Sequence, residues 1–186
     1  MKHQLLFIQG GGAGTHDEWD DKLVDGLRRG LGADYEVRYP RMPDESEPNA
    51  AKWKGAIENE LGKLGDGAIL VGHSIGATIL LNTVAEWATG LSFRGIFLLS
   101  APFVGEGGWP SDGYRSSADL GVRMPPGIPI HFFHGGDDET APIAHADLYA
   151  RAIPQARVHR LPGRDHQLGN DVSEVCAAIR ALDREA

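Results

Sequence analysis

Three residues of this chain stand in an order and in settings that suit acyl transfer: a serine, then an aspartate, then a histidine. The serine, Ser74, is the centre of the pentapeptide Gly-His-Ser-Ile-Gly at residues 72–76. An apolar run typical of a buried strand, residues 68–71, precedes it, and a helix-like stretch, residues 77–87, follows it. A Gly-x-Ser-x-Gly turn between a strand and a helix is a nucleophile elbow, in which a strained backbone exposes the serine hydroxyl. The sequence therefore predicts that Ser74 is a nucleophile.

The acid and the base that such a serine requires follow it along the chain. Asp138 lies in the loop after a strand-like run, residues 128–133, and His166 follows the last such run, residues 158–161. An aspartate in this position can fix the tautomer of a histidine, which takes the serine proton and returns it to the leaving group. Of the eight histidines, only His166 lies in a loop after the final strand-like run. Asp137 is the alternative acid, because spacing alone does not separate neighbours.

A glycine run after the first strand-like segment, residues 5–8, is suited to stabilising negative charge. An oxyanion hole needs backbone N–H groups that a substrate can approach closely, which glycine permits. We assign the two donors to Gly11 and to Ile75, the residue after the nucleophile, with Gly12 as the alternative to Gly11. A phosphate cradle is disfavoured, because no Lys-Ser/Thr pair follows and the glycine pattern of a dinucleotide site is not completed.

No metal ion or cofactor is expected. His131 and His134 are three residues apart in a strand-like run, so their side chains point to opposite faces and cannot ligate the same ion. Asp17, Asp20 and Asp21 are interpreted as charges on the solvated face of a helix N-terminus. The expected chemistry therefore rests on side chains and backbone amides alone.

The amino-acid composition limits the class of protein and the kinds of partner that it is expected to bind. The 186 residues form one expected domain, residues 1–186, with an ordinary hydrophobic content of 41%. A net charge of −8 disfavours nucleic acid and anionic membranes as partners, because the basic surface that neutralises phosphates is missing. The expected partner is a small-molecule acyl substrate, and the oligomeric state is not indicated. Cys176, the only cysteine, indicates a reducing, cytoplasmic location and falls on the apolar face of a terminal helix pattern.

Strand-like and helix-like segments alternate along the chain. This alternation predicts the α/β class: a three-layer α/β/α sandwich around a mainly parallel six-stranded sheet. Helices are expected to open at Thr15, where Glu18 completes a capping box, and at Pro48. The expected strands are residues 5–8, 35–39, 68–71, 96–99, 128–133 and 158–161.

Residues 101–127 interrupt the alternation. This stretch is rich in glycine, serine, proline and aromatic residues, and it is either an ordinary long loop or a short lid over the site. Met42, Phe103, Trp109 and Tyr114 are the expected walls of a substrate pocket, each with loop packing as the alternative interpretation.

Taken in order, three motifs resemble the α/β-hydrolase superfamily. They are the pentapeptide at 72–76, the segment from His134-Gly135 through Asp138 to Pro142, and His166. The resemblance covers the chain from its first strand to its last helix. It implies the strand order 4-3-5-6-7-8 in the superfamily's own strand names, without the first two strands, and acyl transfer of the serine-esterase type.

Within that superfamily, the short chain without a large cap is similar to the small serine hydrolases related to retinoblastoma-binding protein nine. Met42-Pro43, Pro48 and Trp53 carry this narrower resemblance. One departure concerns the first loop, where Gln9-Gly10 stands in place of the usual His-Gly. We expect it to alter how the loop is anchored without removing a backbone donor.

These residues predict a carboxylesterase-type serine hydrolase that forms an acyl-enzyme. Esters, thioesters, lactones and amides all remain open as substrates. The alternative function is a non-catalytic or weakly catalytic protein-binding module on a hydrolase scaffold, since a fold alone does not establish activity.

Overall fold

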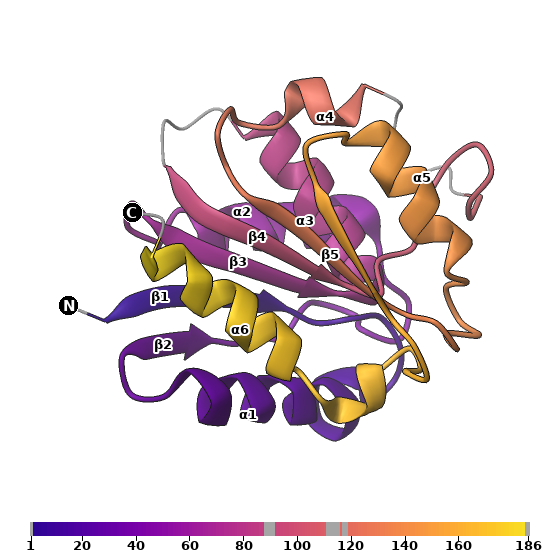
Figure 1. Ribbon diagram of the computed structural model, residues 1–186. Helices are drawn as coiled ribbons and strands as arrows, with labels where there is room; N and C mark the ends of the chain where they lie inside the picture. Colours follow the sequence, from indigo (N-terminus) through magenta and orange to yellow (C-terminus); the bar gives the residue numbers. More distant parts are fainter. Residues whose placement is uncertain (1, 88–91, 111–115, 117–118, 185–186) are drawn as a thin grey trace.

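The computed structural model describes residues 2–87, 92–110, 116 and 119–184, and it contains one six-stranded sheet (Figure 1). The strand order is β2-β1-β3-β4-β5-β6, and every neighbouring pair is parallel. This arrangement confirms the expected fold class and the expected strand order. The strands are β1 (His3–Ile8), β2 (Tyr35–Arg38), β3 (Ala68–His73), β4 (Phe93–Leu99), β5 (Ile130–Gly135) and β6 (Arg157–Leu161).

Helices cover both faces of this sheet and complete three layers. Two of them, α1 (Asp20–Leu31) and α6 (Ser173–Ala181), pack side by side on one face (Figure 1). The other face carries α2 (Ala50–Leu61), α3 (Ser74–Glu86), α4 (Leu120–Arg123) and α5 (Ala144–Ala152). Helices must lie on both faces because each parallel connection crosses over the sheet in the same hand.

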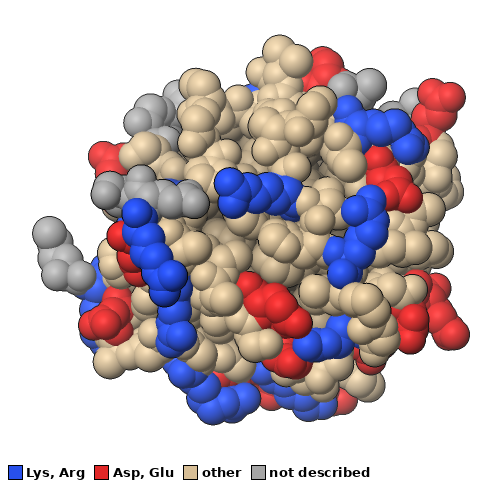
Figure 2. All heavy atoms as spheres, in the orientation of Figure 1, with Lys and Arg blue, Asp and Glu red and all other residues tan. Residues whose placement is uncertain are grey.

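Charged side chains of both signs are interspersed on the surface. On the face drawn in Figure 2, lysines and arginines lie among aspartates and glutamates. Among the described residues, no helix is both long enough and apolar enough to cross a membrane.

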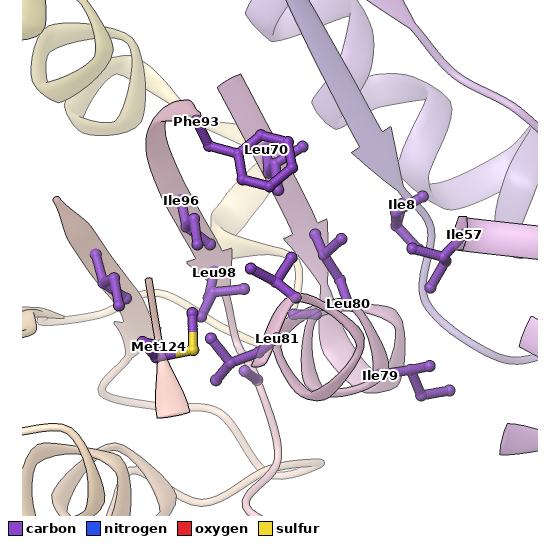
Figure 3. Close-up of a cluster of buried hydrophobic side chains, with 14 of the residues drawn as sticks. Ile8, Ile57, Leu70, Ile79, Leu80, Leu81, Phe93, Ile96, Leu98 and Met124 are labelled. Atoms are coloured by element: carbon purple, nitrogen blue, oxygen red, sulfur yellow. The ribbon is translucent and has the colours of Figure 1, made fainter. Parts of the chain in front are cut away.

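The sheet divides the core into two halves, and the central strand β3 contributes side chains to both. Leu70 belongs to the cluster on one face that also contains the α3 side chains Leu80 and Leu81 (Figure 3), whereas Ile69 and Val71 belong to the cluster under α1 and α6. Successive side chains of a strand point to opposite faces, so a strand covered on both faces must be apolar throughout. This is why residues 68–71 form a continuous apolar run.

The expected helix start at Thr15 is confirmed, but its cap and the start of the next helix differ from the expectation. Residues Thr15–Trp19 form a π-helical turn that begins after Gly14, without a side-chain cap, so the expected capping box is absent. Helix α2 begins at Ala50 rather than at Pro48, because the side chain of Asn49 accepts a hydrogen bond of 3.0 Å from the Lys52 N–H. Asparagine is among the strongest N-cap residues, so it sets the start.

Cys176 lies in the core, as the helix pattern predicted. It is 4% exposed, and it belongs to the apolar cluster between α1, α6 and the sheet. Burial raises the pKa of its thiol, which disfavours the reactive thiolate.

Candidate active site

The elbow has the geometry that its sequence predicts. Strand β3 ends at His73, helix α3 begins at Ser74, and Ser74 has a φ of 51°, in the left-handed region. A Cβ on Gly72 would lie 2.7 Å from the Ala77 Cα, and a Cβ on Gly76 would collide with the backbone oxygen of Gln9. Glycine is therefore required at position 72 by the close approach of α3 across the elbow, and at position 76 by the close approach of α3 to the first loop.

The structure brings Ser74, His166 and Asp138 together from three separate loops at the carboxyl edge of the sheet. The Nε2 atom of His166 lies 2.8 Å from the Ser74 Oγ, and its Nδ1 atom lies 2.8 Å from the Asp138 Oδ2. The imidazole thus bridges a hydroxyl and a carboxylate. This is the arrangement in which a histidine can accept a serine proton while the acid holds its tautomer.

Asp138 is buried and fixed by its own loop. Its Oδ1 accepts hydrogen bonds from the N–H groups of Thr140 (2.9 Å) and Ala141 (2.8 Å), which leaves Oδ2 for His166. Burial opposes its charge, but the hydrogen bond and the charge of His166 outweigh burial and hold the pKa of Asp138 below its usual value. Asp137, the alternative acid, is exposed, and the structure does not bring it to His166.

The first loop separates the two candidate oxyanion donors. The Gly12 N–H donates to the backbone oxygen of Glu45 at 2.6 Å, so it is already committed. The Gly11 N–H makes no hydrogen bond to another residue in the described part of the chain. A Cβ on Gly11 would lie 3.0 Å from the Ile75 Cγ2, so the two predicted donor residues are neighbours. Ile75 lies in the first turn of α3, where backbone N–H groups have no partner within the helix.

Gln9 anchors this loop in a way that its sequence position alone did not specify. Its Oε1 accepts a hydrogen bond of 2.9 Å from the Met42 N–H, and its Nε2 donates to a carboxylate oxygen of Glu45 at 2.6 Å. Glu45 also accepts from the N–H groups of Gly14 and His16. The glycine loop is thereby attached to the segment after β2.

The expected pocket residues occupy different environments. Met42 is 2% exposed and packs in the core cluster beneath α2 and α3, so it is not an open pocket wall. Phe103 is also buried, edge-on to Tyr149, whereas Trp109 is half-buried and edge-on to His145. Tyr114 lies outside the described residues.

The start of segment 101–127 is fastened to the body of the protein. The Pro102 oxygen accepts hydrogen bonds from the Thr78 hydroxyl (2.6 Å) and the Tyr149 hydroxyl (2.9 Å). The Phe103 N–H donates to the His145 Nδ1 at 2.8 Å. The segment therefore leaves the sheet from a fixed base on α3 and α5. Helix α4 is one short turn within this segment.

One site residue was missed by the sequence interpretation. Asp20 was expected on a solvated helix face, but its side chain is fully buried, with its Oδ2 accepting from the Gly10 N–H at 2.7 Å. The signal was the helical spacing, because position 20 falls on the same face as Leu23, Leu27 and Leu31. A charge on that face has to meet a partner in the interior.

The described residues include no group of three or more histidine, cysteine, aspartate or glutamate side chains arranged to hold a metal ion. His131 instead lies 3.0 Å from His159 on the neighbouring strand, and the His134 Nε2 donates to the Ala141 oxygen at 2.6 Å. The two histidines thus have separate partners.

Comparison with known proteins places this fold in a family. A family model described as the alpha/beta hydrolase family matches residues 5–129. This chain belongs to the alpha/beta hydrolase family. The matched region contains Ser74 and both predicted oxyanion residues, whereas Asp138 and His166 lie beyond it.

Several solved structures resemble the whole chain at low sequence identity. The ydeN gene product from B. subtilis has a TM-score of 0.77 and 17% identity, with 98% of this chain and 100% of that chain covered. An esterase domain from a Rhodothermus marinus protein has a TM-score of 0.70 and 19% identity, covering 98% and 87% of the two chains. The esterase RhEst1 from Rhodococcus sp. has a TM-score of 0.66 and 16% identity, covering 97% and 90%. Such identities establish the fold only. No match was found among curated protein sequences.

Proposed function

We propose that this alpha/beta hydrolase is a serine hydrolase of the carboxylesterase type, which cleaves a small acyl ester or a related carbonyl substrate. The observation that carries the proposal is the position of His166, 2.8 Å from both the Ser74 hydroxyl and the Asp138 carboxylate. The imidazole lies between a strained serine and a buried, hydrogen-bonded carboxylate. This arrangement activates a serine for nucleophilic attack.

In the first step, the Ser74 Oγ attacks the carbonyl carbon while its proton passes to the His166 Nε2. The carbonyl oxygen becomes an oxyanion, which accepts hydrogen bonds from the N–H groups of Gly11 and Ile75. The bond to the leaving group then breaks, and His166 gives its proton to the departing oxygen. Each oxyanion donor is worth about 3–4 kcal/mol in such a transition state.

In the second step, water replaces the leaving group. His166 takes a proton from the water, whose oxygen attacks the acyl carbon and forms a second oxyanion at the same amides. The ester bond to the Ser74 Oγ breaks, and the proton on the His166 Nε2 returns to that oxygen. The free acid leaves, and the starting protonation states are restored.

The substrate-binding role of segment 101–127 is part of the same proposal. Phe103 and Trp109 lie on its fixed base, next to α5, where they can limit the acyl group, and we retain Tyr114 as a third wall residue. Met42 contributes by supporting the loop through Gln9 rather than by an open side chain. A site roofed by a short segment favours small or exposed acyl groups.

Two finer assignments accompany this proposal. The narrower group, small serine hydrolases related to retinoblastoma-binding protein nine, is supported by the short chain and by Pro48 and Trp53. A cytoplasmic location is supported by the single buried cysteine, Cys176.

The proposed function is tested by labelling the protein with a fluorophosphonate probe and measuring its intact mass, beside Ser74→Ala. We expect one adduct on the wild-type protein, and no adduct and no ester hydrolysis in the variant, with an unchanged melting temperature. Labelling of the variant would contradict the assignment of Ser74. An unlabelled but folded wild-type protein would favour the binding-module alternative.

A further inference from the structure

A buried carboxylate outside the Ser74–His166–Asp138 set connects the loops that carry the site. The Asp20 side chain is 0% exposed and receives three donors. Its Oδ2 accepts from the Gly10 N–H at 2.7 Å, and its Oδ1 accepts from the Gln167 Nε2 at 3.2 Å. The third donor is the His73 Nδ1, which lies 2.9 Å from Oδ1 and 3.0 Å from Oδ2. One carboxylate therefore touches the glycine loop, the elbow and the loop of His166.

The other side of the His73 ring reaches the loop of the base. Its Nε2 lies 3.0 Å from the backbone oxygen of His166, and the two imidazole rings are 5.0 Å apart between centroids. Both partners of His73, a carboxylate and a carbonyl oxygen, can only accept hydrogen bonds. Both ring nitrogens must then donate, which requires the protonated imidazolium form.

The electrostatics agree with this geometry. Burial disfavours a charged His73, but the charge of Asp20 and its hydrogen bond outweigh burial and raise the pKa of His73 above its usual value. Burial likewise opposes the charge of Asp20, and the His73 cation with the surrounding donors holds the pKa of Asp20 below its usual value. Asp20 and His73 thus form a buried ion pair, in which each charge is the main partner of the other.

The ion pair contacts backbone atoms of the two segments whose position affects the reaction, the glycine loop and the loop of His166. Gly10 directly precedes Gly11, the proposed oxyanion donor, and a Cβ on Gly10 would lie 3.1 Å from both the His73 Nδ1 and the Ser74 Cβ. The other end is the carbonyl group of His166 itself. A shift of either segment by about 1 Å is enough to slow a reaction of this kind about a hundredfold.

We propose that Asp20 and His73 are positioning residues, whose buried ion pair holds the His166 imidazole and the Gly11 amide in register with Ser74. This inference rests on the proposed function. Neither residue touches the reacting atoms, so both act through the loops that they hold.

The charge on His73 makes the rate of the reaction depend on pH. The titratable groups facing the pair are Asp138 and His166 beside His73, and Tyr39 beside Asp20. The two accepting partners of His73 require its imidazolium form, and because its pKa is raised, this form is lost only as the pH rises through a value above 6.5. The neutral ring can donate to only one of its two partners, so the reaction slows on the alkaline side.

The test compares Asp20→Asn with Asp25→Asn by the rate of fluorophosphonate labelling across a range of pH. Asp25 is a matched control because it is an exposed aspartate on the same helix, paired with Arg28. We expect Asp20→Asn to slow labelling by about tenfold to a hundredfold at neutral pH, and to move the alkaline decline to lower pH. Asp25→Asn should follow the wild-type profile.

A second measurement does not depend on activity. Long-range proton–nitrogen NMR spectra of histidine rings distinguish imidazolium from neutral imidazole, and we expect His73 to be imidazolium at neutral pH and neutral in Asp20→Asn. The spectrum of the wild-type protein shows whether the ion pair exists, even where Asp20→Asn fails to fold. In that case His73→Gln, which keeps one amide donor, replaces Asp20→Asn in the labelling comparison.

The outcomes separate the two proposals. An unlabelled wild-type protein overturns the proposed function, and with it the positioning role. A labelled wild-type protein with an equally fast, folded Asp20→Asn variant overturns the positioning role alone, as does a neutral His73 ring at neutral pH.

Discussion

At the scale of single residues, the choice between two adjacent aspartates was the least determined part of the site. Asp137 and Asp138 occupy the same loop and have the same chemistry, so spacing did not separate them. In the structure, Asp138 points inward, where the N–H groups of Thr140 and Ala141 hold one oxygen and the other faces His166. Only the closed turn of the loop decides which neighbour is buried, and that turn is a tertiary property.

Replacing each of these aspartates by asparagine tests the assignment. In Asp138→Asn, the amide oxygen still accepts from the loop, but the amide group cannot hold the correct tautomer of His166 or balance its positive charge. We expect kcat for p-nitrophenyl acetate to fall by about 10⁴-fold with little change in melting temperature. Asp137→Asn is the control and should keep the wild-type rate, because its side chain is exposed. Equal losses in both variants would assign the acid elsewhere.

For Asp20, the sequence did contain a sign of burial, but the general rule for acidic residues at helix N-termini led to the wrong prediction. Acidic residues near a helix N-terminus are usually solvated and favoured by the helix dipole, and Asp17 and Asp20 satisfied that rule equally well. The helical spacing of Asp20 with the buried leucines of α1 pointed inward. What the sequence could not supply was the partner, because His73 is 53 residues away along the chain.

At the scale of elements, the strands were the most predictable part of the fold. A strand in the middle of a parallel sheet is buried on both faces, so its apolar residues run without interruption and identify it. Its ends are less clear, since β3 continues through Gly72 and His73, two residues that hydrophobicity does not mark. The first helical turn begins at Thr15 as expected, whereas the start of α2 was missed by two residues because a cap at Asn49 set the boundary.

The elbow makes a prediction at this scale, because the contact of α3 with the first loop depends on the absence of a side chain. A Cβ in Gly76→Ala would meet the Gln9 backbone oxygen and lie 3.0 Å from the Ile8 Cγ2. We expect the free energy of unfolding to fall by about 1–3 kcal/mol. We also expect slower fluorophosphonate labelling, since Gln9 and Gly10 must move. Urea unfolding and the labelling rate measure the two effects.

Gly55→Ala is the matched control for this substitution. Gly55 lies on the exposed side of α2, and a Cβ there would have no neighbour within 4 Å. Alanine is the better helix former, so this variant should be more stable than the wild type by about 1 kcal/mol. Destabilisation of both variants by the same amount would show that steric contact at the elbow is not the cause.

At the scale of the whole molecule, the site lies where the carboxyl ends of the strands meet. The acid, the base and the serine come from loops after β5, β6 and β3, and the glycine loop follows β1. Strand order alone predicts this convergence, because ligand sites of open parallel sheets lie at their carboxyl edge. The order of the loops was therefore predictable from sequence, whereas the ion pair beneath them required the packing of α1 against the elbow.

The ion pair of Asp20 and His73 makes the stability of the folded molecule depend on pH, with opposite signs for the two residues. Asp20 has a pKa lowered from 3.8, so the stability it contributes is present above that value and is lost as the pH falls through its folded-state pKa. His73 has a pKa raised from 6.5, so its contribution is present below 6.5 and is lost as the pH rises through its folded-state pKa. The pair is therefore most stabilising between these two limits.

Urea unfolding of the wild type and Asp20→Asn at a series of pH values measures this contribution directly. Asparagine at position 20 carries no charge at any pH, so the difference in unfolding free energy between the two proteins isolates the ionised carboxylate. We expect that difference to be largest between the two limits and to shrink toward both acid and alkali. Protonating Asp20 removes the charge that the variant also lacks, whereas deprotonating His73 leaves the wild-type carboxylate buried without its cation. Asp25→Asn, on the exposed side of the same helix, should track the wild type throughout. A difference between wild type and Asp20→Asn that stayed constant across pH would mean that the side chain stabilises the fold by packing and neutral hydrogen bonds, and that the two buried charges contribute nothing.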